Sequence, residues 1–138
     1  MNDQTQRAQF DAEGMGIRSA TNNDTAVLRE LFEKSRVEGQ TRENDTGADL
    51  DYLMAGYFEC KESGFWVAQY KESIIGMIGV QRVSDNSAEI RRLRVRDTFR
   101  RNGIGTKLML HAIEFCKKKQ FLKIVLDVRI ERSPALKL

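Results

Sequence analysis

The stretch "AEIRRLRVRDTFRRNGIGTKLMLHAIEFCKK" (residues 88–118) decides the fold of this chain. Residues 88–96 predict a strand, and residues 104–119 predict an amphipathic helix. One face of that helix carries Gly105, Leu108, Met109, Ala112, Ile113 and Cys116, and the other carries Lys107, His111, Glu114 and Lys118. A loop with two arginines and two glycines joins the two elements. The stretch is therefore a strand, a glycine-bearing loop and a helix in direct succession.

This loop has the chemistry of a phosphate site. The first turn of a helix leaves backbone N–H groups without helical partners and carries the positive end of the helix dipole. Gly103 and Gly105 let the backbone approach a ligand closely. Arg100 and Arg101 would add charge-assisted hydrogen bonds to the same anion. The loop predicts a phosphate or pyrophosphate ligand; the alternative is a helix-entry turn that binds nothing.

Two common phosphate motifs are excluded. No G-x-x-x-x-G-K-[ST] occurs in the chain, so the Walker mechanism is out. Gly103 and Gly105 fit the first two positions of G-x-G-x-x-G, but Leu108 occupies the third. A Rossmann dinucleotide site would lack its helix-packing glycine.

The remaining elements predict a mixed sheet with helices, of the α/β (α+β) class. A strand is predicted at 15–21, a helix around Val27–Phe32, a second helix through Leu50–Phe58, and strands at 64–70, 74–83 and 121–128. The three middle strands form an antiparallel meander that leads into a β-loop-α-β crossover, so the last two strands should be parallel. The last strand is apolar enough to be buried on both faces. Residues 1–14 are expected to be a disordered tail before a single domain at 15–138.

Composition excludes several function classes. The chain has 138 residues, 41% hydrophobic and 31% charged, with a net charge of +3. No run approaches the roughly 20 apolar residues of a membrane span, and the start lacks a secretory signal. One histidine and two cysteines without metal-like spacing argue against a metal site. We expect a cytoplasmic protein with reduced thiols and no membrane partner.

The sequence resembles the GNAT superfamily of N-acetyltransferases. Arg100–Gly105 matches that family's [Q/R]-x-x-G-x-[G/A] signature, and "AEIRRLRV" is similar to its fourth strand. Residues 104–119 resemble its third helix, "MGIRSATNNDTAVLREL" its first strand and helix, and "FWVAQYKESIIGMIGV" its second and third strands. The resemblance runs from about residue 15 to the end of the chain.

The resemblance implies acetyl-CoA as the cofactor and transfer of its acetyl group to a primary amine, by direct attack within a ternary complex. The implied cofactor-binding residues are Leu93, Arg94 and Val95, whose backbone would pair with the pantetheine arm, and Arg100, Arg101, Asn102, Gly103, Ile104, Gly105 and Thr106 around the pyrophosphate. The fourth and fifth strands splay apart there in the family. Glu89 stands where family members often have a general base.

Several alternatives stay open. Glu89 has the alternative of a sheet-edge carboxylate paired with a neighbouring arginine. Arg92, Arg94 and Arg96 alternate along one strand face; that pattern favours a solvated face over a role near the substrate or the CoA 3′-phosphate. The acidic segment "RENDTGADLD" (42–51) is interpreted as a solvated loop and helix start rather than a collar for a cationic amine. A nucleic-acid-binding domain, suggested only by the arginine cluster, lacks interleaved aromatics.

The end of the chain departs from the family pattern. "RSPALKL" (132–138) is in register with the start of the family's fourth helix, N-x-x-A-x-x-L-Y, with Arg132 in place of Asn. We therefore expect an incomplete acetyltransferase domain without the last helix and strands, or a homodimer whose partner covers the last strand. A non-catalytic CoA-binding or interaction module is the alternative function. The acceptor, whether a small molecule or a peptide, is not specified by the sequence.

Overall fold

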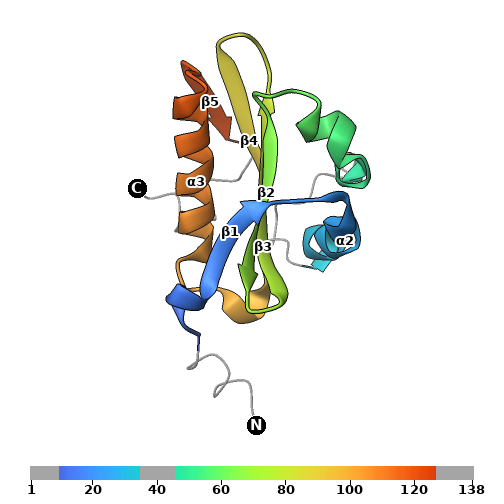
Figure 1. The fold of residues 1–138 in the computed structure, drawn as a ribbon, viewed down its shortest axis with the longest axis vertical. Coiled ribbons are helices and arrows are strands. Elements are labelled where there is room, and N and C mark those ends of the chain that lie inside the picture. The colour runs from blue at the N-terminus through green and yellow to red at the C-terminus, as the bar shows by residue number, and fades with distance from the viewer. Residues whose placement is uncertain (1–9, 35–45, 127–138) are drawn as a thin grey trace.

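A computed structural model describes residues 10–34 and 46–126. Its centre is a five-stranded sheet in the order β1-β2-β3-β4-β5 (Figure 1). The strands are β1 (Met15–Ser19), β2 (Gly64–Tyr70), β3 (Ser73–Arg82), β4 (Ser87–Val95) and β5 (Lys123–Leu126). All neighbours are antiparallel except β4 and β5, which are parallel. This confirms the predicted meander and crossover.

Helices cover both faces of the sheet (Figure 1). The long helix α3 (Ile104–Lys118) packs on one face, and α2 (Thr25–Lys34) packs on the other together with two short helices, η3 (Ala48–Asp51) and η4 (Met54–Phe58). Three more single turns complete the described elements: η1 (Ala12–Gly14), η2 (Asn22–Asp24) and η5 (Asp97–Phe99). Each face of the sheet thus has its own hydrophobic core, and β3 contributes buried residues to both.

Two glycines of β3 let these layers come close to the sheet. A Cβ at Gly76 would lie 2.9 Å from Leu108 Cδ1 of α3 and 3.2 Å from the Arg94 carbonyl oxygen. On the opposite face, a Cβ at Gly79 would lie 2.8 Å from Phe65 Cδ2 and 3.0 Å from Tyr57 Cε1. The close approach that glycine in a strand often marks is therefore present on both sides.

The predicted second helix is wrong as a continuous element. The segment instead forms the single turn η3 and the wider turn η4, which are separated at Tyr52 (φ −135°, ψ 58°). Leu50, Leu53 and Tyr57 are fully buried, as their spacing predicted, but Met54 is 55% exposed. The physical reason is tertiary: Asp49 pairs with Arg92 of β4, and that contact overrides the local helical preference.

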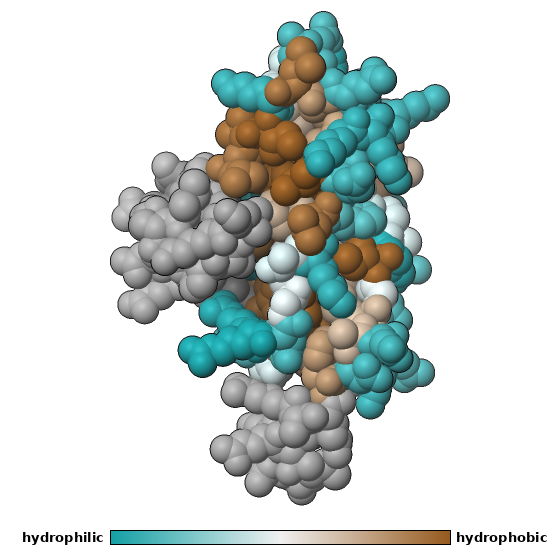
Figure 2. Space-filling view, turned by 90° about the vertical axis from the view of Figure 1, so that its left-hand side faces the viewer, coloured by the Kyte–Doolittle hydropathy of each residue, from teal (hydrophilic) through white to brown (hydrophobic). Residues whose placement is uncertain are grey.

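The last strand was expected to be buried on both faces, and this is also wrong. Lys123 and Val125 are exposed, and only Ile124 and Leu126 pack against the core under α3. Within the described part of the chain β5 is an edge strand, because its other side has no paired neighbour. Figure 2, seen from the side that α3 covers, shows hydrophobic side chains at the surface. The exposed apolar residues of α3, β5 and the turn between them are Leu110, Leu122 and Val125.

The end of the expected disordered tail is ordered where the structure describes it. Phe10 packs against the rings of Tyr70 and Phe99, with centroids 4.8 and 5.8 Å away. The side chain of Asp11 caps η1 by accepting from the Glu13 N–H. Residues 1–9 lie outside the described residues, as do residues 127–138, on which the expectation of a missing helix rests.

The packing at Gly79 predicts a destabilising substitution. Gly79→Ala should lower the free energy of unfolding by about 1–3 kcal/mol, because a methyl group would overlap the Phe65 and Tyr57 rings. Gly16→Ala is the matched control on β1, where an added Cβ meets no heavy atom within 4 Å. Urea unfolding of both variants measures the difference; equal stabilities would contradict the described packing.

Candidate active site

A bulge in β4 organises the candidate site. In the β3–β4 register Gly79 faces Arg91 and Met77 faces Arg94, so β4 takes three steps where β3 takes two. The extra residue is accommodated at Arg92, whose φ is +63°. Ala88 and Ile90, before the bulge, and Leu93 and Val95, after it, all pack on the core under α3. Consequently Arg91 and Arg92 are adjacent in sequence but both lie on the α2 side of the sheet.

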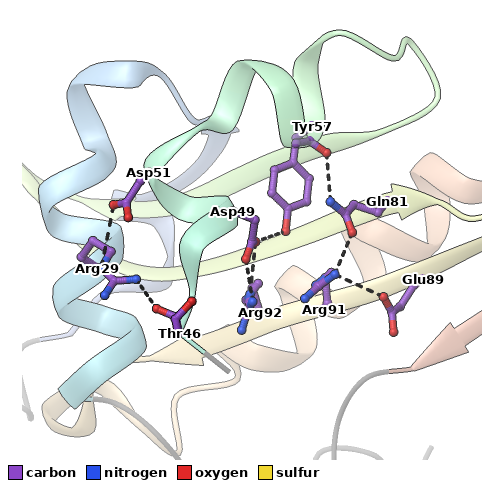
Figure 3. Close-up of polar contacts among 10 residues, drawn as sticks. Arg29, Thr46, Asp49, Asp51, Tyr57, Gln81, Glu89, Arg91 and Arg92 are labelled. Atoms are coloured by element: carbon purple, nitrogen blue, oxygen red, sulfur yellow. Dashed lines mark hydrogen bonds and ion pairs between the residues drawn. The ribbon is translucent and has the colours of Figure 1, made fainter. Parts of the chain in front are cut away.

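Arg92 is held in place by Asp49 of η3 (Figure 3). Its Nη2 lies 2.6 Å from Asp49 Oδ1 and its Nε 3.2 Å from Asp49 Oδ2, a two-pronged contact. The guanidinium also lies 4.9 Å from the centre of the Phe32 ring of α2. Only 4% of the Arg92 side chain is exposed. The solvated interpretation of Arg92, and of the acidic segment at Asp49, is therefore wrong.

Tyr57 is the third member of this cluster, and the contacts within the cluster set the protonation states of Asp49 and Tyr57. The Tyr57 hydroxyl donates to Asp49 Oδ2 over 2.6 Å. Burial tends to raise the pKa of Asp49, but the hydrogen bonds from Arg92 and Tyr57 and the charges of Arg92 and Arg91 outweigh burial and lower it. Burial and the Asp49 carboxylate both raise the pKa of Tyr57. At neutral pH the cluster thus holds an ionised Asp49 and a neutral, donating Tyr57.

The other two arginines of the predicted strand face also have intramolecular contacts. Arg96 bonds Glu30 Oε1 over 2.8 Å and the Ile74 carbonyl over 2.9 Å. Arg94 Nη1 donates to the Leu93 carbonyl over 2.9 Å, and its guanidinium lies over the Phe32 ring. These contacts link α2 to β4, so Arg94 and Arg96 are not simply solvated charges.

The described pairing of β4 with β5 ends just before the bulge. Parallel pairing runs from Ser87 opposite Lys123 to Ile90 opposite Leu126, and it ends there within the described residues. Leu93, Arg94 and Val95 follow on β4 without a described strand on that side. The predicted pantetheine-binding residues therefore lie on the part of β4 that has no strand beside it among the described residues, where the Leu93 carbonyl already accepts from Arg94 Nη1.

The predicted phosphate loop has the backbone shape of an anion nest. Arg101 (φ +67°) and Gly103 (φ +76°) both have left-handed backbones, an arrangement that turns successive N–H groups to one side. Within the described chain, no backbone carbonyl accepts from the N–H groups of Arg101, Asn102 or Gly103. The Asn102 side chain instead stabilises the loop by donating to the Phe99 carbonyl over 3.1 Å. Gly103 begins α3 without a side-chain cap.

The space over this loop is open. A Cβ at Gly103 would meet nothing within 4 Å, and a Cβ at Gly105 would meet only Val95 Cγ2 at 3.8 Å. Packing inside the chain therefore does not require glycine at position 105. The buried Ile104 fixes the loop to the core between these two open positions. Thr106 is half-buried in the same turn, and Arg100 has Asp97 as an ion-pair partner at 3.2 Å.

Glu89 lies on β4 and faces the α2 side of the sheet. Its Oε1 is 3.5 Å from Arg91 Nη1, and 27% of its side chain is exposed. The arginine-paired alternative is thus present in the structure, although the contact is long for an ion pair. Glu89 and Leu93–Val95 belong to one strand, so β4 carries both the candidate base and candidate cofactor residues.

Comparison with known proteins places the chain in a family. The model of the acetyltransferase (GNAT) family matches residues 26–138. The chain belongs to the GNAT acetyltransferase family. N-acetylaspartate synthetase of Danio rerio is 33% identical over 91 residues, which are 65% of this chain and 32% of that protein. The chain therefore spans less than half the length of this curated relative.

Solved structures share the GNAT fold. Ard1 from Thermoplasma volcanium superimposes with a TM-score of 0.70 at 24% identity, covering 90% of this chain and 78% of that one. N-acetylglutamate synthase from Neisseria gonorrhoeae, solved with coenzyme A and L-arginine, gives a TM-score of 0.59 at 17% identity, over 78% of this chain and 23% of that one. Both confirm the predicted fold class.

The described part of this GNAT domain has neither a candidate metal site nor a helix that could span a membrane. Residues 10–34 and 46–126 contain no group of three or more His, Cys, Asp or Glu side chains that could hold a metal ion. None of the helices described there has the length and hydrophobicity to cross a membrane.

Sequence reasoning missed the cluster around the bulge of this GNAT domain. It did not single out Asp49, Tyr57, Gln81 or Arg91 as functional residues. The available signal was the pair of arginines at 91–92. Apolar residues alternate with polar ones up to Ile90, and the arginine pair interrupts this alternation. The partner residues are distant in sequence and carried no signal of their own.

Removing the Asp49 charge should destabilise the fold. Asp49→Asn leaves the buried Arg92 guanidinium without this carboxylate, and we expect a loss of about 3 kcal/mol in the free energy of unfolding. Asp51→Asn is the control, because that side chain is 49% exposed and its nearest guanidinium nitrogen, on Arg29, is 3.9 Å away. Urea unfolding should show a change of only about 0.5 kcal/mol or less for the control.

The same cluster predicts acid sensitivity. Because folding lowers the pKa of Asp49, its contribution is complete above the unfolded pKa of about 4 and is lost as pH falls through the folded value. Stability of the wild type should therefore fall with decreasing pH in this range, and Asp49→Asn should make the decline shallower. Urea midpoints measured at several pH values test the slope; identical slopes would show that Asp49 does not contribute.

Proposed function

We propose that this chain is an acetyl-CoA-dependent N-acetyltransferase that acts on a primary amine by direct attack in a ternary complex. The observation that carries the proposal is the open nest at the start of α3, next to the part of β4 that lies beyond the described β5 pairing. Membership of the GNAT family and the coenzyme A in the related N-acetylglutamate synthase structure support it. The relative named N-acetylaspartate synthetase supports an amine of amino-acid type among the acceptors to be tested.

The proposed cofactor site has two parts. Backbone N–H groups from Arg101 to Thr106 would hold the pyrophosphate, with the dipole of α3 and the Arg100 and Arg101 side chains adding positive charge. The peptide groups of Leu93, Arg94 and Val95 would hydrogen-bond the pantetheine arm as a neighbouring strand does. When bound, acetyl-CoA supplies the activated acetyl group as a thioester.

Glu89 is the proposed general base. An amine attacks only when its nitrogen has lost the extra proton of the ammonium form, and Glu89 would accept that proton directly or through a water. The nitrogen then bonds to the acetyl carbonyl carbon as the carbon–sulfur bond breaks, and the departing thiolate takes up a proton. The nearest guanidinium nitrogen among the described residues, Arg91 Nη1, lies 3.5 Å from Glu89 Oε1 on the α2 side of the sheet.

The arginine cluster does not favour a nucleic-acid-binding function. Arg92 and Arg96 each have a carboxylate within 2.8 Å, so their charges are largely compensated inside the domain. The remaining alternative is a module that binds CoA without catalysis. Release of free thiol from acetyl-CoA in the presence of an amine panel separates this alternative from the enzyme.

Position 105 gives a sharp test of the cofactor site. Gly105→Val should weaken acetyl-CoA binding at least about tenfold, because its side chain would extend into the open space over the nest. Gly105→Ala, which the family signature allows, is the matched control: it should retain binding and stabilise α3 by about 0.5–1 kcal/mol. Calorimetry with acetyl-CoA and thermal unfolding measure the two effects. Equal affinity of both variants would contradict the proposed site.

The role of Glu89 is tested separately. Glu89→Gln keeps the shape but removes the proton acceptor, so kcat should fall about 100-fold with an unchanged dissociation constant for acetyl-CoA. Raising the pH should partly restore the rate, because more of the amine is then already deprotonated. A normal rate at neutral pH would remove Glu89 from the mechanism.

A further inference from the structure

We infer that the acceptor is an α-amino acid or a similar amine with a neighbouring carboxylate, and that Arg91 recognises this carboxylate. The inference rests on the proposed function, because it names the substrate class of the same site. It is carried by an arginine whose hydrogen-bonding capacity is largely unused, next to the candidate base.

Arg91 lies on the face of the sheet that α2, η3 and η4 cover, away from the glycine loop at the start of α3. Ala88 and Ile90, which precede it on β4, pack under α3, whereas Arg91 contacts Gln81, which donates to the carbonyl of Gly56 in η4. The nest at the start of α3 belongs to the opposite layer. An anion bound by Arg91 is therefore distinct from the CoA pyrophosphate.

The hydrogen bonds of Arg91 leave donors unused. Nη1 donates to Gln81 Oε1 over 2.7 Å and approaches Glu89 Oε1 only at 3.5 Å. Nε is buried and has no hydrogen-bond partner among the described residues. A buried N–H without a partner costs free energy, and a carboxylate bound to the exposed part of the same guanidinium would offset part of that cost.

The guanidinium is already oriented for a ligand. Gln81 Nε2 donates to the Gly56 carbonyl over 3.0 Å, so the Gln81 amide is fixed between η4 and Arg91 (Figure 3). About a fifth of the Arg91 side chain is exposed (22%), enough for contact with a ligand. Rigid, partly buried arginine is the residue best suited to bidentate carboxylate binding.

The charges around Arg91 indicate the class of ligand. Arg92 and Arg96 have close carboxylate partners at 2.6 and 2.8 Å, whereas the nearest carboxylate to Arg91 is Glu89 at 3.5 Å. Glu89 and Arg91 thus present a negative and a positive group a few ångströms apart. The ammonium and carboxylate of an α-amino acid have the complementary arrangement: the amine meets the base, and the carboxylate replaces Glu89 as the partner of Arg91.

Matched pairs of amines test the inference. The probes are L-phenylalanine with 2-phenylethylamine, L-leucine with 3-methylbutylamine, and L-aspartate. Their binding to the full chain saturated with CoA is measured by calorimetry or ligand-observed NMR, alongside thiol release with acetyl-CoA. For at least one pair, the amino acid should bind about tenfold or more tightly than the amine without the carboxylate.

Variants of Arg91 assign the preference to this side chain. Arg91→Met should bring the affinity ratio close to one, mainly by weakening the amino acid, and Arg91→Lys should recover only part of the preference. Arg82→Met is the matched control, because Arg82 lies at the exposed end of β3 with Glu62 and Asp85 as its partners. The affinity for CoA should be unchanged in all three variants, which shows that they are folded.

The outcomes are distinguishable. Equal binding of both members of every pair, no binding of any carboxylate probe, or an unchanged ratio in Arg91→Met would overturn the inference. Thiol release with neutral amines alone would leave the N-acetyltransferase function standing without this substrate class. Carboxylate-dependent binding lost in Arg91→Met, without acetyl transfer to any probe, would support the Arg91 site and count against the proposed activity.

Discussion

The contact between Asp49 and Arg92 is the constraint on which the candidate site depends. Arg92 has a left-handed backbone in the middle of a strand, which is unfavourable for a residue with a side chain. The conformation persists because the Asp49 carboxylate accepts hydrogen bonds from the Arg92 guanidinium and the Phe32 ring packs against it. The ion pair therefore connects η3 to β4, the ring contact connects α2 to β4, and both lie at the bulge that interrupts pairing with β3.

Because of the bulge, β4 presents different functional groups on the two faces of the sheet. On the α3 side, Leu93 and Val95 continue the hydrophobic core up to the glycine loop. On the other side, Glu89 and Arg91 are presented together beside Gln81. The described β5 pairing ends at Ile90, between these two regions. This arrangement explains how one strand can serve both a cofactor and an acceptor in the proposed reaction.

Local determinants made much of this predictable. The glycine loop and α3 were predicted correctly because conformational freedom, unpaired N–H groups and amphipathic spacing are properties of neighbouring residues. The segment at 48–58 was not, because Asp49 and Tyr57 respond to an arginine more than thirty residues away. The burial of β5 was also not predicted correctly. Its apolar sequence suggested full burial, whereas within the described residues only one of its faces is covered.

The sequence by itself determined the order of the strands, the family and the position of the glycine loop before α3. These follow from periodicity and from a short motif, both of which are local. Only the tertiary structure decided which of the arginines have a carboxylate at close range. Charge pairing depends on distances of a few ångströms between distant segments, and a single extra residue in β4 changes the face to which a side chain points. For that reason Arg91, one of four arginines in six residues, was distinguished from the others only in three dimensions.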